Sequence, residues 1–309
     1  MTGKADKPMS YKDEVTVAAV NFHAAWGEKA ANLVRILAQA GEAADRGAQI
    51  VLFPELALTG YNHDKGSIAM QQRDAEPVPG PATDALAAHS RERGIWIVVG
   101  LPERDEATGT LYNSAVVTGP EGLVGCYRKI HPAGKESLWC AKGEAPLLFD
   151  TPWGPVGVGI CLDTYRFPEL VRYHAAQGAR LYLNPTALPL VPDWEALYYT
   201  TLNARVLENS VFVASANLVG KDRDVSFPGG SMIIGPGTET PKPLVHAGPV
   251  EGEEGMVIAT IDLADGARLR GWLPLTAPNR VTGVPDWRPA VYSRLLGDIL
   301  ASSNWRDSR

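Results

Sequence analysis

Three residues that could share one catalytic site stand at the ends of strand-like segments. Glu55 ends the segment "IVLFPE", Lys129 ends "LVGCYRK", and Cys161 ends "VGVGIC". In sheets that alternate with helices, ligand sites gather at the carboxyl ends of the strands. A carboxylate, an ammonium group and a thiol at three such ends therefore form a candidate constellation for covalent catalysis.

The chemistry that this set could perform is nucleophilic attack on a carbonyl carbon. A free thiol has a pKa of about 8.5, so only a small fraction is thiolate at neutral pH. A neighbouring carboxylate can accept the thiol proton during attack, and a lysine ammonium can stabilise the oxyanion that forms. One such oxyanion donor is worth about 3–4 kcal/mol. A helix that we expect to begin near Pro168 adds a positive dipole end close to Cys161.

Each of these residues alone has an ordinary structural explanation. Most lone cysteines are buried core residues, and we interpret Cys126 and Cys140 in that way. A glutamate after "FP" could cap a loop, and a lysine after a strand is usually solvated. The joint placement of the three residues favours catalysis. The odd number of cysteines, with no CxxC pair, argues against a disulfide framework, a zinc site or a thiol redox protein.

The first part of the chain predicts a strand, a helix and a second strand. Residues 15–22 and 49–56 are strongly apolar, as in buried strands. Between them, one apolar face over residues 28–46 and the following Gly47 predict a long helix. Elements in this order form a βαβ unit, whose two strands should be parallel.

The rest of the chain mixes crossover helices with hairpins. Helices are predicted over residues 81–94, 168–177 and 194–210, strands over 95–103, 179–185, 211–219 and 256–263, and hairpins over 110–130, 147–161 and 230–248. This mixture favours a pair of mixed sheets with helices outside over one parallel sheet. We expect a flexible N-terminal arm (1–14), one domain (15–284) and a helical C-terminal tail (285–309), which could pack on its own domain or on a second subunit.

The composition argues against several classes of protein. The chain has 309 residues, a formal net charge of −6 and no basic stripe, so we expect no nucleic-acid partner. No apolar run approaches the roughly 18 residues of a membrane span, and the polar N-terminus is not typical of a signal peptide. We therefore expect no membrane association. The cysteine pattern favours a reducing, cytoplasmic location.

Five segments together resemble a known family. Residues 53–61 ("FPELALTGY"), 127–132 ("YRKIHP") and 159–170 ("GICLDTYRFPEL") resemble the three signature segments of the nitrilase, or carbon–nitrogen hydrolase, superfamily. Residues 203–217 and 227–239 provide two further matches. The segments follow in the family's order and spacing over roughly residues 15 to 280.

The resemblance implies an α/β fold of four layers, an αββα sandwich with two mixed β-sheets and outer helices. It implies association through the helical faces into a homodimer or larger homo-oligomer, with no metal and no organic cofactor. It further implies that Glu55 acts as general base and that Cys161 attacks the carbonyl or nitrile carbon to form a thioester. Lys129 would hold the oxyanion together with the backbone N–H of Leu162.

The family often carries a second glutamate after the lysine segment. Glu136, seven residues before Gly143, matches that spacing, and it would orient the substrate amide and the attacking cysteine. A solvated loop carboxylate is the alternative interpretation. From their positions in the chain, the candidate substrate-binding residues are Tyr61, Trp139, Leu162, Asn184 and Thr186.

The residues after the nucleophile favour one branch of the family. True nitrilases tend to carry tryptophan and glutamate after the cysteine, whereas this chain has Leu162 and Asp163, followed by "RFPE". This resembles the amidase and carbamoylase branches. Arg166 stands one residue further from Cys161 than is usual there, so a carboxylate-binding role is not carried over to it.

We therefore expect a hydrolase that cleaves a small non-peptide amide through a cysteine thioester and releases ammonia. An N-carbamoyl hydrolase, which would also release carbon dioxide, is the close alternative. A nitrilase and a non-catalytic scaffold of the same fold are the others.

Overall fold

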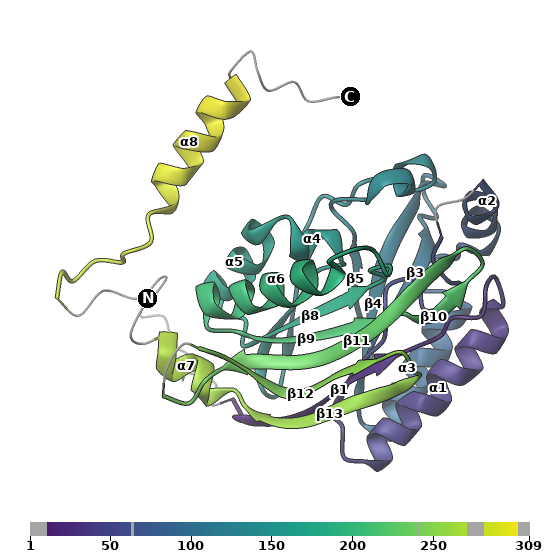
Figure 1. The fold of residues 1–309 in the computed structure, drawn as a ribbon, viewed down its shortest axis with the longest axis horizontal. Coiled ribbons are helices and arrows are strands. Elements are labelled where there is room, and N and C mark those ends of the chain that lie inside the picture. Colours follow the sequence, from purple (N-terminus) through teal and green to yellow (C-terminus); the bar gives the residue numbers. More distant parts are fainter. Residues whose placement is uncertain (1–10, 63–64, 240–241, 271–280, 302–309) are drawn as a thin grey trace, which may run out of the picture.

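The computed structural model describes residues 11–62, 65–239, 242–270 and 281–301. Two β-sheets lie at its centre, and helices cover their outer faces (Figure 1). This arrangement confirms the predicted pair of mixed sheets with outer helices. Among the described helices, none combines the length and the apolar character that crossing a membrane requires.

The first sheet orders its strands β13-β1-β2-β3-β4-β5. Their bounds are β1 (Glu14–Asn21), β2 (Ile50–Leu52), β3 (Trp96–Arg104), β4 (Leu111–Gly119), β5 (Gly122–Arg128) and β13 (Gly255–Asp262). Strands β1, β2 and β3 are parallel to one another, and the remaining neighbours are antiparallel. The parallel pair β1 and β2, joined by helix α1 (Lys29–Asp45), confirms the predicted βαβ unit.

The second sheet orders its strands β10-β11-β9-β8-β7-β6, and β12 also pairs with β11. Their bounds are β6 (Leu147–Thr151), β7 (Gly154–Val158), β8 (Leu181–Thr186), β9 (Phe212–Asn217), β10 (Val219–Asp222), β11 (Val225–Pro236) and β12 (Pro243–Glu251). Strands β7, β8 and β9 are parallel. The hairpin of β6 and β7 therefore delivers the chain to Cys161 at the carboxyl end of a parallel strand.

Helices form the outer layers (Figure 1). The bounds of the others are α2 (Lys65–Asp74), α3 (Pro81–Arg93), α4 (Leu162–Tyr165), α5 (Pro168–Ala176), α6 (Trp194–Asn209), α7 (Ala264–Arg270) and α8 (Pro289–Ala301), and a 3-10 helix, η1, spans Gly134–Leu138. Helix α3 packs on β4 and β5 of the first sheet, while α6 packs on β9 and β11 of the second.

The short strand β2 shows how the sequence builds two cores. Ile50 and Leu52 belong to the apolar cluster shared with the second sheet, whereas Val51 belongs to the cluster that includes Ile36 of α1. Successive side chains of a strand point to opposite faces, so a strand covered on both sides must be apolar throughout. Such a strand is held firmly, and the residues that follow it are placed by a rigid frame.

Three helices, α2, α4 and α7, were not predicted from the sequence. Helix α2 was not predicted, because its sequence "KGSIAMQQRD" has too few apolar residues for a helical stripe. Besides the packing of Ile68 and Met70, polar bonds hold it: the side chain of Gln71 accepts from the Thr59 hydroxyl (2.9 Å) and donates to the Gly60 carbonyl (2.8 Å). Helix α4 was also missed, since four residues are too few to show a period.

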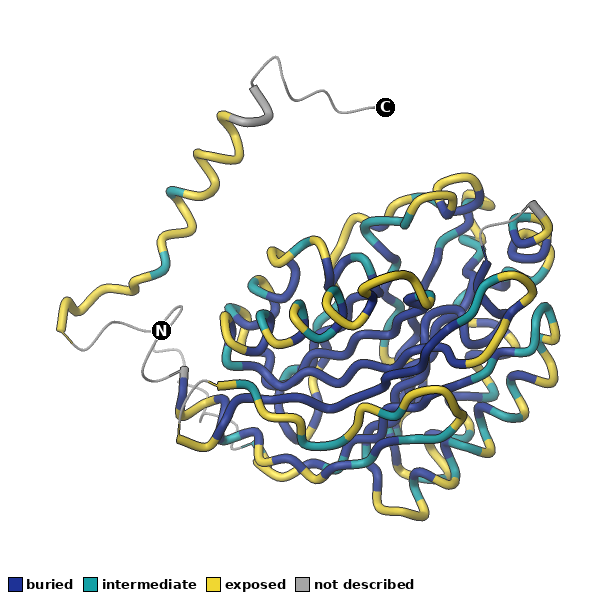
Figure 2. Tube along the Cα trace, in the orientation of Figure 1, coloured by how far each residue is buried: buried dark blue, intermediate teal, exposed yellow. Residues whose placement is uncertain are grey.

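The tail confirms the predicted helical signal as α8. The helix stands apart from the layered body (Figure 1), and its described residues are mostly exposed (Figure 2). Tyr292 is 55% exposed and Leu296 is 53% exposed, which is unusual for apolar side chains on one helix face. A groove of about 1060 Å³ lies between this segment and α5, with Tyr173 and Tyr292 among its lining residues.

Candidate active site

Glu55 lies in the turn that follows β2, and its side chain is fully buried. The backbone there presses against Gly100 of β3: a Cβ at Gly100 would lie 2.6 Å from the Glu55 Cα, so no side chain fits. The carboxylate accepts three hydrogen bonds. Oε1 accepts from Lys129 Nζ (2.6 Å) and Asn113 Nδ2 (2.7 Å), and Oε2 accepts from the Ala187 N–H (2.9 Å).

Lys129 follows β5, and Glu136 lies in η1, a few residues later. The Lys129 ammonium is fully buried and donates to both Glu136 oxygens at 2.9 Å. The Tyr61 hydroxyl also donates to Glu136 Oε1. Glu136 is only 2% exposed, so the alternative of a solvated loop carboxylate does not hold.

The cluster joins two buried carboxylates to one ammonium. Burial raises the pKa of Glu55, Lys129 opposes this shift, and Glu136 adds to it. Burial would lower the pKa of Lys129, but the two glutamates raise it well above the usual lysine value. Lys129 therefore keeps its positive charge at neutral pH, while Glu55 is a stronger base than an exposed glutamate.

Cys161 lies in a strained turn between β7 and α4, with φ 49° and ψ −104°. Its N–H donates to the Pro185 carbonyl (3.0 Å) and to Asn184 Oδ1 (3.1 Å). Burial raises the pKa of the Cys161 thiol strongly and Glu55 raises it further, while Lys129 and the Thr186 hydroxyl oppose the shift. The resting group is thus a thiol, which requires a base at the moment of attack.

The side chain of Asn184, on β8, forms hydrogen bonds that hold the turn containing Cys161. Its Oδ1 accepts from the Cys161 N–H and from Thr164 Oγ1 (2.8 Å), and its Nδ2 donates to Tyr165 Oη (3.1 Å) and Ser215 Oγ (2.8 Å). These bonds use the full capacity of the amide. The arrangement favours a positioning role for Asn184 over direct substrate contact.

Leu162 and Trp139, two further candidates, lie at the start of α4 and at the end of η1. Leu162 is the first residue of α4, and its backbone N–H has no hydrogen-bond acceptor among the described residues. The helix start next to Cys161 is therefore that of α4, whereas the predicted start at Pro168 belongs to α5. Trp139 is buried, and its backbone N–H donates to the Glu136 carbonyl (2.9 Å).

Asp163 is a functional candidate that sequence reasoning used only to choose a family branch. It is fully buried. Its carboxylate accepts from the Tyr127 hydroxyl (2.7 Å), from the His131 N–H (2.9 Å) and imidazole Nδ1 (2.8 Å), and from the Ile160 N–H (3.3 Å). These bonds tie the lysine segment to the nucleophile turn. The only sequence signal was the place of Asp163, two residues after Cys161.

Asn113 of β4 was missed altogether. Its amide donates to Glu55 Oε1 and to Glu136 Oε2 (3.2 Å), so it bridges the two carboxylates. An asparagine inside the apolar strand "LYNSAVV" gives no sequence signal of this role. Only the pairing of β4 with β3 and β5 places it beside the glutamates.

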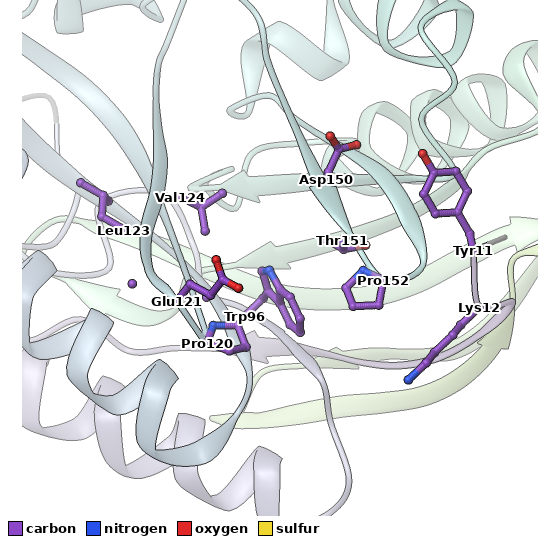
Figure 3. A pocket seen from close by; sticks show the side chains of 12 residues that line it. Tyr11, Lys12, Trp96, Pro120, Glu121, Leu123, Val124, Asp150, Thr151 and Pro152 are labelled. Atoms are coloured by element: carbon purple, nitrogen blue, oxygen red, sulfur yellow. The ribbon is translucent and has the colours of Figure 1, made fainter. Parts of the chain in front are cut away.

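The pocket in Figure 3, with a volume of about 780 Å³, lies at the other end of the strands. Its lining includes Trp96, where β3 begins, together with Glu121 and Asp150. Glu55 and Cys161 follow the opposite ends of β2 and β7. None of the predicted site residues lines this pocket, so it is separate from the catalytic cluster.

Comparisons with known proteins agree with this arrangement. The sequence profile of the carbon–nitrogen hydrolase family matches residues 16–270. A nitrilase of Pyrococcus abyssi is 38% identical over 226 residues, which cover 72% of this chain and 80% of that protein. An omega-amidase of Xenopus laevis is 36% identical over 268 residues, which cover 82% of this chain and 90% of that protein.

The fold comparison gives the same answer. The crystal structure of Saccharomyces cerevisiae Nit3, a member of the nitrilase superfamily, matches with a TM-score of 0.76 at 26% identity. The match covers 87% of this chain and 98% of that chain. Profile, relatives and fold thus coincide, and the chain belongs to the carbon–nitrogen hydrolase family of the nitrilase superfamily.

Proposed function

We propose that this carbon–nitrogen hydrolase is an amidase that cleaves a small, non-peptide amide through a thioester on Cys161 and releases ammonia. The observation that carries the proposal is the buried bond between Glu55 and Lys129, beside a thiol whose pKa both charges affect. A base, a fixed positive charge and a nucleophile are the three parts that acyl transfer to sulfur requires.

In the first half-reaction, the Cys161 sulfur attacks the amide carbon while Glu55 takes the thiol proton. The carbonyl oxygen becomes an oxyanion, which the Lys129 ammonium and the Leu162 N–H stabilise. The C–N bond then breaks, and the proton held by Glu55 passes to the leaving nitrogen. Ammonia departs, and the acyl group remains on Cys161 as a thioester.

In the second half-reaction, Glu55 takes a proton from a water molecule as its oxygen attacks the thioester carbon. The same donors stabilise the second oxyanion. The C–S bond breaks, the carboxylic acid leaves, and the sulfur regains a proton from Glu55. Glu136, anchored by Lys129 and Tyr61, orients the substrate amide during both steps.

An amide substrate is favoured over a nitrile by the residues after the nucleophile. Relatives of both kinds are similar to this chain, one named a nitrilase and another an omega-amidase. Leu162 and Asp163 replace the tryptophan and glutamate that are typical of true nitrilases. We infer that Tyr61, Trp139 and Thr186 bound the substrate cavity near Cys161.

The proposal is tested by an ammonia-release screen over omega-amides, aliphatic amides, carbamoyl compounds and nitriles. We expect turnover of amides, and a loss of at least about 10³-fold in Cys161→Ala with an unchanged circular dichroism spectrum. Carbon dioxide released with ammonia would instead identify the carbamoyl hydrolase. Turnover of nitriles alone, or full activity in Cys161→Ala, would contradict the proposal.

A further inference from the structure

We propose that Asn113 is a positioning residue that holds Glu55 and Glu136 in place and keeps the general base ionised in the working pH range. This inference rests on the proposed function, because it assigns Asn113 a task within the same site. It goes beyond the family motifs, since Asn113 lies outside all five of the segments that resemble them.

Strand pairing fixes the backbone of Asn113 and so determines where its side chain lies. Asn113 lies opposite Pro102 of β3 in the first sheet, and its carbonyl accepts a hydrogen bond from the Lys129 N–H (2.8 Å). The side chain is fully buried. Strand pairing therefore places the amide, and also connects it directly to the backbone of the lysine whose ammonium lies between the glutamates.

The amide nitrogen then serves two acceptors at once. Nδ2 is 2.7 Å from Glu55 Oε1 and 3.2 Å from Glu136 Oε2. An amide nitrogen carries two hydrogens, one for each carboxylate. Lys129 bridges the same pair of glutamates, so the two carboxylates have two shared donors. One donor is charged and the other is neutral.

The charge of the cluster explains why a neutral donor matters. Two ionised carboxylates and one ammonium leave an excess negative charge among buried side chains, which favours protonation of a glutamate. The ionisable groups that face Glu55 are Lys129, Glu136, Tyr61, Cys140 and Cys161. Hydrogen bonds from Lys129 and Asn113 lower the pKa of Glu55 against the effect of burial.

The amide oxygen of Asn113 is evidence against a purely structural role for this side chain. Asn113 Oδ1 is buried without a hydrogen-bond partner among the described residues, which destabilises the folded chain. A leucine of similar shape would avoid that cost. The amide therefore contributes to the molecule through its two N–H donors, and both of them point to the catalytic glutamates.

The test is the pH profile of Asn113→Leu. Without the donors the pKa of the base rises, so the acid limb of kcat/KM should move up by about one pH unit. Activity should be about tenfold lower below the limb and recover toward the wild-type value above it, with KM changed less than about threefold. Ser114→Ala is the matched control, because Ser114 is equally buried on β4 but donates to Glu103 (2.6 Å), outside the cluster.

A second readout separates this inference from the proposed function. The rate at which iodoacetamide alkylates Cys161 is followed by mass spectrometry across the same pH range. It depends on proton transfer to Glu55 and needs no substrate, so it tests Asn113 even if no amide is hydrolysed. We expect the same upward shift. If Asn113→Leu does not fold, the isosteric Asn113→Asp, which adds an acid to the cluster, is expected to move the limb in the same direction.

Two results would overturn the inference. One is an acid limb that stays at the wild-type pH in the variant that folds. The other is a loss of activity that is equal at every pH, as a general distortion of the site would produce.

Discussion

The Lys129 ammonium is fully buried between two carboxylates, and this makes it structurally indispensable as well as catalytic in our proposal. A buried ion pair adds little net stability, because the cost of removing both charges from water offsets their attraction. Removing one partner is different, since it leaves the other charge buried and unpaired.

We expect Lys129→Met to lower the free energy of unfolding by about 3–5 kcal/mol at neutral pH and to abolish activity. Glu55 and Glu136 would be left as neighbouring like charges. The deficit should shrink as the pH falls, because protonation of one glutamate removes the repulsion. Urea unfolding at two pH values measures this. The control is Lys135→Met, because Lys135 is an exposed lysine next to Glu136 in η1; equal losses in both variants would contradict the argument.

His174 of α5 gives a second prediction at the scale of one residue. Its side chain is buried against Gly157 of β7 and Tyr182, and burial lowers its pKa to about 4. The unfolded chain binds this proton at a pKa of about 6.5. Stability from this group is thus complete above pH 6.5 and is lost as the pH falls toward 4, by up to about 3 kcal/mol.

We therefore expect His174→Phe, whose ring has a similar shape, to unfold with less dependence on pH than the wild type between pH 6.5 and 4. Chemical unfolding at pH 7.5 and 4.5 measures the difference. At pH 7.5 both rings are uncharged, so that measurement isolates packing. A variant that is as sensitive to acid as the wild type would show that other groups dominate acid unfolding.

At the scale of elements, the position of the turn that contains Cys161 depends on the end of β5 as much as on β7. Asp163, in α4, collects donors from Tyr127 and His131, which flank Lys129 in the chain. The His131 ring also stacks on Phe167, with centroids 3.4 Å apart. The turn that contains Cys161 and the segment that contains Lys129 are thus joined by hydrogen bonds, which fix the sulfur and the ammonium relative to each other.

Asp163→Asn tests this coupling, because the amide nitrogen would face groups that themselves donate. We expect kcat to fall by about tenfold to a hundredfold, the equivalent of one lost hydrogen bond to a charged group. KM should change far less. Steady-state kinetics and the alkylation rate of Cys161 measure the effect, and Asp150→Asn, at an exposed residue of β6, is the control. An unaltered kcat would show that the hydrogen bonds of Asp163 are not needed to position the turn.

The elements also show what the sequence could predict. The apolar runs before Glu55 and Cys161 predict strands, and the apolar face of α1 predicts a helix. The catalytic candidates were found because they stand where the predicted strands end. Asn113 and Asp163 were not found as a network, because their role depends on partners far away in the chain: Asn113 donates to Glu55, 58 residues distant. Strand pairing creates such contacts, and no local pattern encodes them.

At the scale of the whole molecule, α8 has an exposed apolar face that a second copy of the chain would cover. Tyr292, Leu295 and Leu296 are each about half exposed, and the groove beside α5 has an apolar lining. We propose that the helical layer with α5, α6 and α8 forms a homodimer interface. This extends the association that the family resemblance implies, and it accounts for an apolar stripe that would otherwise face water.

We expect Leu296→Asp to weaken self-association by roughly a hundredfold, because a two-fold interface contains each substitution twice and burial of one leucine contributes about 1.5–3 kcal/mol. Light scattering over a concentration series measures this. Val281→Asp is the control, at a residue that is 93% exposed. A wild-type chain that stays monomeric at high concentration would contradict the proposal.

The two glutamates and one lysine of the cluster have a consequence for how readily each product leaves the site. An enclosed region with surplus negative charge repels a newly formed carboxylate and attracts an ammonium ion. The acid should therefore be expelled readily, while ammonium added to the assay should compete for the site. For the same reason, a substrate that carries its own carboxylate must hold that group at the far end of the molecule, away from Glu55 and Glu136.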